Sequence, residues 1–251
     1  MFKEYFLLLL LGHVLGDFYI QTGKMAEKKE KSLRWVLIHC FCYWAMMLLI
    51  SLPILSWKIA FAATVATILH LIIDVIKFAY KSWKVKKGKM TLTVKRNVFF
   101  VDQIAHCICL FGITYWIIGS KVPIIEWKRF KDFFDIIGVS EGLMLSWILA
   151  LFVIHKPANI VIQKLLMIYK PESRDQNKKK DNNAGRFIGT VERIIMLIFI
   201  SIGQYASIGL VLTAKSIARY DRISKEKDFA EYYLLGTLIS TVIVIVCSFI
   251  I

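Results

Sequence analysis

Long apolar runs separated by short, very basic connectors dominate this chain. Six runs are near or above the ~20 residues that a helix needs to cross a bilayer, and a shorter one precedes them, from Tyr5 to Tyr19, which turns polar at its end. A soluble domain would alternate apolar and polar positions instead. The pattern predicts an all-α protein, a polytopic transmembrane helical bundle of about six or seven membrane helices. The six longer runs are 35–56, 59–80, 98–118, 141–168, 192–214 and 231–251.

The first run is not expected to be a cleaved signal peptide, because no small-residue cleavage site follows it. Five cysteines lie in or beside apolar runs and do not form the spacing of a secreted disulfide framework. Both observations favour a membrane bundle that keeps its first helix.

The positive charge is concentrated in alternate connectors. Lys and Arg number five in 22–34, eight in 77–96, six in 170–186 and five in 215–227, whereas 53–58 holds only Lys58. The positive-inside rule then predicts that these basic loops are cytoplasmic and that the N-terminus is outside. Since the lysines flank apolar runs, the net charge of +15 reflects membrane topology, and no nucleic-acid partner is expected.

The run 192–214 conflicts with this topology, because both of its flanks are basic. Its middle, "SIGQYASIG", holds small and polar residues where a helix can break. A re-entrant hairpin buried against protein and a plain seventh crossing both remain open.

A polar, turn-rich segment divides the chain. "PESRDQNKKKDNNAG" at 171–185 is predicted to be a cytoplasmic linker. Four parts follow: a four-helix membrane domain at 1–118, an outer connector with a fifth helix at 119–170, the linker 171–185, and a C-terminal membrane unit at 186–251.

Three apolar runs each carry a histidine and an aspartate four residues apart. That spacing places both side chains on one helix face. With alternating helix directions, the three pairs fall at one depth near the cytoplasmic side, where they are expected to share a pocket. The pairs are His13 with Asp17, His70 with Asp74, and Asp102 with His106.

Imidazole and carboxylate groups at one depth are suited to a divalent metal, zinc or manganese, as one or two ions. All six residues of the pairs are candidate ligands, and Gln21, His39 and Gln103 are candidate residues that orient them. Thiolates from Cys42 and Cys109 are a weaker option. The plain alternative is a set of interhelical hydrogen bonds that only hold the bundle together.

The C-terminal part carries further basic residues. Arg193, Lys215 and Arg219 are candidates for a phosphate or lipid-headgroup site on the cytoplasmic side. The alternative is that they are interfacial charges whose stems lie along apolar surface.

Several of these motifs match one known family. "GHVLGDFYIQTGKMAEKK", "LIHC", "HLIIDVIK" and "DQIAHC" together resemble the bacterial and phage membrane-protein family called domain of unknown function 3307, over roughly residues 5–118. "GRFIGTVER", "AKSIAR" and "AEYYLLGTLIS" look like the region that often accompanies it. The resemblance implies a multi-pass protein of the bacterial cytoplasmic membrane, and it implies no substrate.

The leading functional hypothesis is a metal-dependent hydrolase at the inner leaflet, acting on a lipid-like or phosphorylated substrate. Asp17, Asp74 or Asp102 would serve the catalytic step, and Lys77 would stabilise negative charge. A transporter or channel for a metal ion, proton or small anion is the alternative. A non-catalytic accessory protein that docks a soluble cytoplasmic partner is a third.

Overall fold

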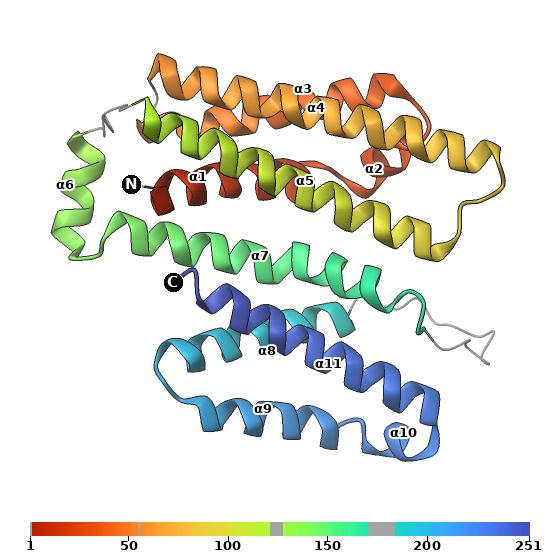
Figure 1. Ribbon diagram of the computed structural model, residues 1–251. Helices are drawn as coiled ribbons and strands as arrows, with labels where there is room; N and C mark the ends of the chain where they lie inside the picture. The colour runs from red at the N-terminus through yellow and green to blue at the C-terminus, as the bar shows by residue number, and fades with distance from the viewer. Residues whose placement is uncertain (1, 55, 121–127, 171–183) are drawn as a thin grey trace. The chain divides into compact units, whose positions relative to one another are not determined.

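The computed structural model describes residues 2–54, 56–120, 128–170 and 184–251, and every regular element among them is helical (Figure 1). The predicted all-α class is confirmed. The chain forms two compact units that divide inside one helix, between Leu149 and Ala150. The predicted linker falls largely outside the described residues, so the predicted four-part division stays a prediction.

Five of the described helices are long and apolar enough to cross a membrane. Each coincides with a predicted run, with the ends shifted by a few residues. Ser56 and Thr91 accept hydrogen bonds from backbone N–H groups three residues on, which fixes where two of these helices begin. The five are α3 (Leu33–Ser51, extended by the short helix η2, Leu52–Ile54), α4 (Trp57–Lys86), α5 (Leu92–Gly119), α7 (Glu141–Leu166) and α11 (Lys227–Ser248).

The first apolar run forms a sixth span only together with the sharp bend that follows it. α1 (Phe2–Val14) continues into a π-helical segment, η1 (Leu15–Ile20), and then turns by 92° into α2 (Gly23–Lys29). Thr22 begins α2 by accepting a hydrogen bond from the Met25 N–H at 3.2 Å. Asp17 lies within the π-helical segment η1. Such wide turns are frequent at functional sites.

Unit 1 contains a four-helix bundle, in which α1 and α4 each pack against both α3 and α5 (Figure 1). Its apolar core fills the end of the bundle where α1 begins, with Leu9, Met47, Ala62 and Ile113 among its buried members. In the connector after α5, the structure also has a helix that the apolar pattern did not predict, α6 (Lys128–Ile137). Polar residues occupy the opposite end of the bundle.

Two glycines allow α1 to approach α3 closely. A Cβ at Gly12 would lie 2.5 Å from Met47 Sδ, and one at Gly16 would lie 2.6 Å from Tyr43 Cδ2. Both distances are impossible for a real side chain. Small residues four apart are a common means of bringing membrane helices together, and here they set the distance across which Asp17 meets α3.

In unit 2, the run 192–214 is broken into two helices. α8 (Ala184–Ser201) is followed by Gly203, which has a left-handed φ of +72°. The Gln204 N–H donates to the Phe199 carbonyl at 2.8 Å, which closes the helix end. Of the two alternatives that the sequence left open for this run, the helix break is the one that the structure has.

The two halves of this run form a hairpin (Figure 1). α9 (Tyr205–Ile217) returns alongside α8, and Lys215 near its end pairs with Glu192 at 2.6 Å. The short helix α10 (Tyr220–Lys225) then leads into α11. A hairpin brings both flanks of the run to one end of the unit, which is the arrangement that the two basic flanks require.

Candidate functional site

A buried polar cluster occupies the end of unit 1 opposite its apolar core. It uses the end of α1 with η1, the end of α2, the first half of α3 and the middle parts of α4 and α5. The three predicted His/Asp pairs do lie together at this level. The histidines and aspartates of the cluster are each 8% exposed or less: His13, Asp17, His39, His70, Asp74, Asp102 and His106.

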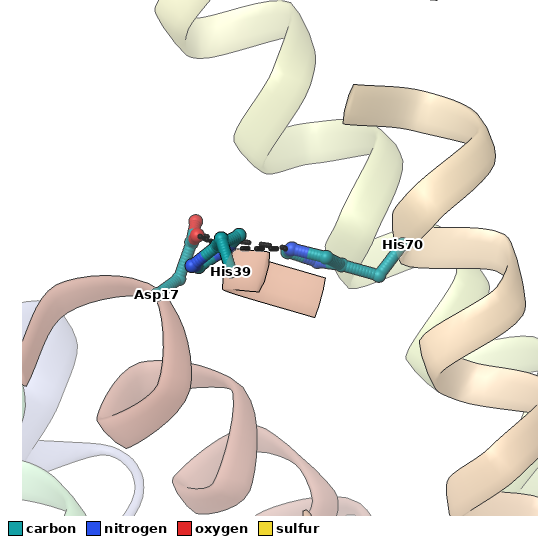
Figure 2. A group of neighbouring side chains, drawn as sticks. All are labelled: Asp17, His39 and His70. Atoms are coloured by element: carbon teal, nitrogen blue, oxygen red, sulfur yellow. Dashed lines mark hydrogen bonds and ion pairs between the residues drawn. The ribbon is translucent and has the colours of Figure 1, made fainter. Parts of the chain in front are cut away.

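At the centre, two imidazoles and a carboxylate converge (Figure 2). His39 Nε2 lies 3.1 Å from His70 Nε2. Asp17 Oδ1 lies 3.2 Å from the His39 nitrogen and 3.8 Å from the His70 nitrogen. Three side chains from η1, α3 and α4 thus point their ligand atoms at one place.

A second carboxylate, Asp74, borders the same nitrogens. Its Oδ2 lies 3.4 Å from His70 Nε2 and 3.7 Å from His39 Nε2. Lys29, which α2 inserts into the cluster, donates to this oxygen at 2.6 Å and to Gln21 Oε1 at 2.9 Å. The bend after η1 is therefore what brings an ammonium group to the site.

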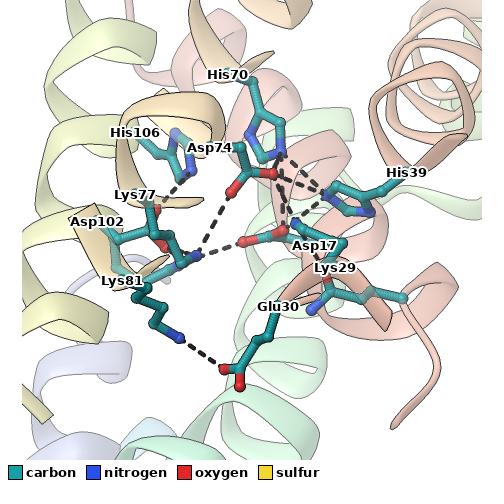
Figure 3. A network of polar contacts seen from close by, with 12 residues as sticks. Asp17, Lys29, Glu30, His39, His70, Asp74, Lys77, Lys81, Asp102 and His106 are labelled. Carbon is teal, nitrogen blue, oxygen red and sulfur yellow. Dashed lines mark hydrogen bonds and ion pairs between the residues drawn. The ribbon is translucent and has the colours of Figure 1, made fainter. Parts of the chain in front are cut away.

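The third carboxylate, Asp102, lies on the other side of the cluster (Figure 3). Its Oδ2 accepts hydrogen bonds from Lys77 at 2.6 Å and from Gln103 at 3.2 Å. Gln103 also donates to Asp17 Oδ2 at 3.0 Å. One amide on α5 therefore ties the carboxylates of η1 and α5 together.

His13 takes part through hydrogen bonds rather than at the centre. Its Nδ1 lies 3.3 Å from the Tyr43 hydroxyl, and its Nε2 lies 3.4 Å from Gln103 Oε1. The ring of Tyr43 stacks on His70 with centroids 4.0 Å apart, and His70 stacks on His106 at 4.2 Å. A column of three rings from α3, α4 and α5 therefore fixes how the imidazoles face.

The central group has the spacing of metal ligands. In a tetrahedral site with bonds of about 2.1 Å, distances of 3.1–3.8 Å between ligand atoms correspond to angles of about 95–130°. Asp17, His39 and His70 supply three ligand atoms, which leaves one position for water or substrate. Two other groups have ligand atoms within 4.8 Å of each other: Cys40, His70 and Asp74; and Asp17, Asp102 and His106.

The charges of the cluster balance only with a further cation or with a proton on one of its imidazoles. With neutral imidazoles, its three aspartates outnumber Lys29 and Lys77 by one negative charge. An unbalanced buried charge is costly, especially within a membrane. One divalent ion would reverse the excess to a single positive charge, which an anion would then neutralise.

Among the described residues, the polar cluster does not extend into the apolar core that fills the other half of the bundle. Ser51, Thr67 and Thr114 each donate to the carbonyl four residues earlier in their own helix. Around them the described core is apolar. The cluster therefore reaches the surface at one end of unit 1, where the Lys77 side chain is 23% exposed.

Sequence reasoning assigned some roles differently. It treated His39 as an orienting residue, whereas its ring nitrogen lies among the central ligand atoms, and His13 lies outside the three groups. It missed Lys29, Tyr43 and Cys40. Tyr43 lies four residues after His39 on one helix face, which was a usable signal. Cys40 is adjacent to His39 and had no such signal, and Lys29 lies in a basic connector that resembled a solvated loop.

The predicted anion-binding residues of unit 2 do not meet. Arg193 is 1% exposed, and it donates to the Ile154 carbonyl at 2.7 Å, three residues before Pro157. Its guanidinium also donates to Asn159 Oδ1 at 2.9 Å. Lys215 pairs with Glu192, whereas Arg219 is exposed before α10. Arg193 therefore ties α8 to the turn of α7 that the proline disturbs.

The fold and the cluster together define an α-helical membrane-type bundle with a buried His/Asp site. A family model described as protein of unknown function (DUF3307) matches residues 5–130, which is half of the chain and contains the whole cluster. The protein belongs to this family. Neither the curated proteins nor the solved structures yield a match.

Proposed function

We propose that unit 1 is a metal-dependent hydrolase of the membrane, with a divalent zinc or manganese ion held by Asp17, His39 and His70. The observation that carries the proposal is the convergence of His39 Nε2, His70 Nε2 and Asp17 Oδ1 at 3.1–3.8 Å. Three protein ligands with a fourth position open are the arrangement of catalytic zinc sites. Such an ion activates a water as a nucleophile near neutral pH.

The second nitrogens of the two ligand histidines depart from the usual pattern of metal sites. Nδ1 of His39 and Nδ1 of His70 have no hydrogen-bond partner among the described residues, whereas ligand imidazoles normally donate from that atom. Stacking of Tyr43 on His70 supplies the orientation instead. The Nε2 atoms therefore face the centre without a hydrogen bond behind them.

Asp74 is the proposed general base. It borders both ligand nitrogens, and Lys29 keeps its carboxylate charged and oriented at 2.6 Å. Lys77 lies at the exposed edge, between Asp74 and Asp102, where it can stabilise negative charge on a substrate. The roles of the remaining predicted residues, His13, Gln21 and Gln103, are to orient these groups through hydrogen bonds.

The proposed substrate is anionic and partly apolar, such as a phosphate ester of a lipid. The positive excess of the metal-loaded cluster favours an anion, and the surrounding helices expose apolar side chains suited to lipid, including Phe41 and Ile76. The alternative of a transport pathway is less well supported, because the polar cluster ends at the apolar core.

The test combines metal content with turnover. We expect purified wild-type protein to bind metal and to hydrolyse phosphatidate in mixed micelles. His39→Ala should lose both, while Asp74→Asn should keep its metal and lose about a hundredfold in rate or more. His155→Ala removes an exposed imidazole from α7 and serves as the control. Folded wild-type protein that holds no metal after reloading would contradict the proposal.

A further inference from the structure

Two buried polar atoms on α5 face each other without a hydrogen bond. Asp102 Oδ1 and His106 Nε2 lie 3.6 Å apart, on residues that are 4% and 2% exposed. Neither atom has a hydrogen-bond partner among the residues that the structure describes. Buried groups of this kind are normally satisfied, so the pair points to a ligand between them.

The surroundings hold both atoms in this orientation. Lys77 and Gln103 both donate to the other oxygen of Asp102, which leaves Oδ1 directed toward His106. The His106 ring is fixed by its stacking on His70, with centroids 4.2 Å apart. The open pair is therefore produced by specific contacts on two sides.

A metal ion fits this gap better than a water does. At bonds of about 2.1 Å, atoms 3.6 Å apart subtend an angle of about 118° at an ion, close to tetrahedral. At hydrogen bonds of about 2.8 Å, they would subtend only about 80° at a water, which is too acute for two good hydrogen bonds. The spacing therefore favours the shorter bonds of a metal.

A third ligand is shared with the site proposed above. The Asp17 carboxylate has an oxygen within 4.8 Å of the ligand atoms of Asp102 and His106, and it also borders His39 and His70. We propose that Asp102, His106 and Asp17 form a second divalent-metal site, and that Asp17 bridges the two ions. Paired ions about 3.5–4 Å apart are typical of enzymes that hydrolyse phosphate esters.

The net charge of the cluster determines when the second metal ion can bind. This inference rests on the proposed metal function. With the first ion bound, the cluster already has one positive charge in excess. A second ion raises the excess to three, so it should bind well only with an anion present. A phosphate dianion with a hydroxide would balance it. Inorganic phosphate should therefore raise the occupancy of the second site.

The test is manganese stoichiometry with and without inorganic phosphate, together with electron paramagnetic resonance. In phosphate, wild-type protein should hold two ions per chain with a spin-coupled spectrum. His106→Ala and the nearly isosteric Asp102→Asn should hold one uncoupled ion, and His155→Ala should retain two. Thermal unfolding of each variant confirms that it is folded.

The outcomes separate the two proposals. One ion in wild-type protein, unchanged in His106→Ala and Asp102→Asn, would overturn the second site and leave the first intact. Two ions without magnetic coupling would overturn the bridging role of Asp17. No ion in folded wild-type protein would overturn the proposed function as well.

Discussion

Gly16 is the residue on which the geometry of the cluster depends most directly. It lies one position before Asp17, and its missing side chain makes room for the ring of Tyr43. Tyr43 in turn stacks on His70. A small change at this position should therefore alter both helix packing and the proposed metal ligands.

We expect Gly16→Ala to destabilise unit 1 by about 1–3 kcal/mol, because its Cβ would lie 2.6 Å from the Tyr43 ring. It should also weaken metal binding. Gly112→Ala, in α5, is the control, since a Cβ there meets no atom within 4 Å. Thermal unfolding in detergent, with metal titration, measures both effects. Equal stability of the two variants would refute the close approach of α1 and α3.

At the scale of single residues, sequence reasoning found the pairs better than their roles. A four-residue spacing identifies residues that share a helix face, so the pairing of His70 with Asp74 could be predicted from the sequence. It does not say which imidazole of a neighbouring helix turns toward that face. His39 was for this reason assigned a supporting role, although its nitrogen lies 3.1 Å from that of His70.

Among the elements, α2 has a role beyond connecting two helices. The 92° bend after η1 carries Lys29 back into unit 1, where it pairs with Asp74. An ammonium group at this oxygen competes with a metal ion for the same negative charge. α2 therefore stabilises the cluster through this pair, and we expect it to oppose the loading of the proposed metal site.

We expect Lys29→Met to have opposite effects on the two states. Without metal, it should lose roughly 3 kcal/mol of stability, because Asp74 becomes a buried charge without its partner. Its affinity for metal should rise about tenfold as the repulsion between the cations disappears. Lys24→Met, an exposed position on the same helix, is the control. Metal-dependent thermal shifts test this, and a variant with weaker metal binding would contradict it.

The elements differ in how far the sequence could predict them. Apolar length alone indicated the five long helices. The break in 192–214 was visible in its glycines, but only the left-handed Gly203 and the Glu192–Lys215 pair establish a hairpin. The apolar run that contains η1 did not reveal its π-helical geometry, and α6 is amphipathic and too short to appear as an apolar run.

For the whole molecule, the separation of polar and apolar ends is the main feature of unit 1. The cluster lies at the end where the basic connectors emerge, and the apolar core fills the other. The positive-inside rule places that end in the cytoplasm, which stays a prediction. The shared depth of the three His/Asp pairs could be inferred from the sequence, because the inference needs only alternating helix directions and residue counts.

The most direct test of the account is X-ray absorption at the zinc edge of the loaded protein. The proposed centre predicts nitrogen and oxygen ligands at about 2.0–2.1 Å with imidazole scattering, and no sulfur. His39→Ala, which is expected to lose the metal, should lose the bound-zinc absorption with it. A zinc–sulfur distance of about 2.3 Å would instead indicate the group of Cys40, His70 and Asp74. A spectrum without any imidazole contribution would contradict the metal centre itself.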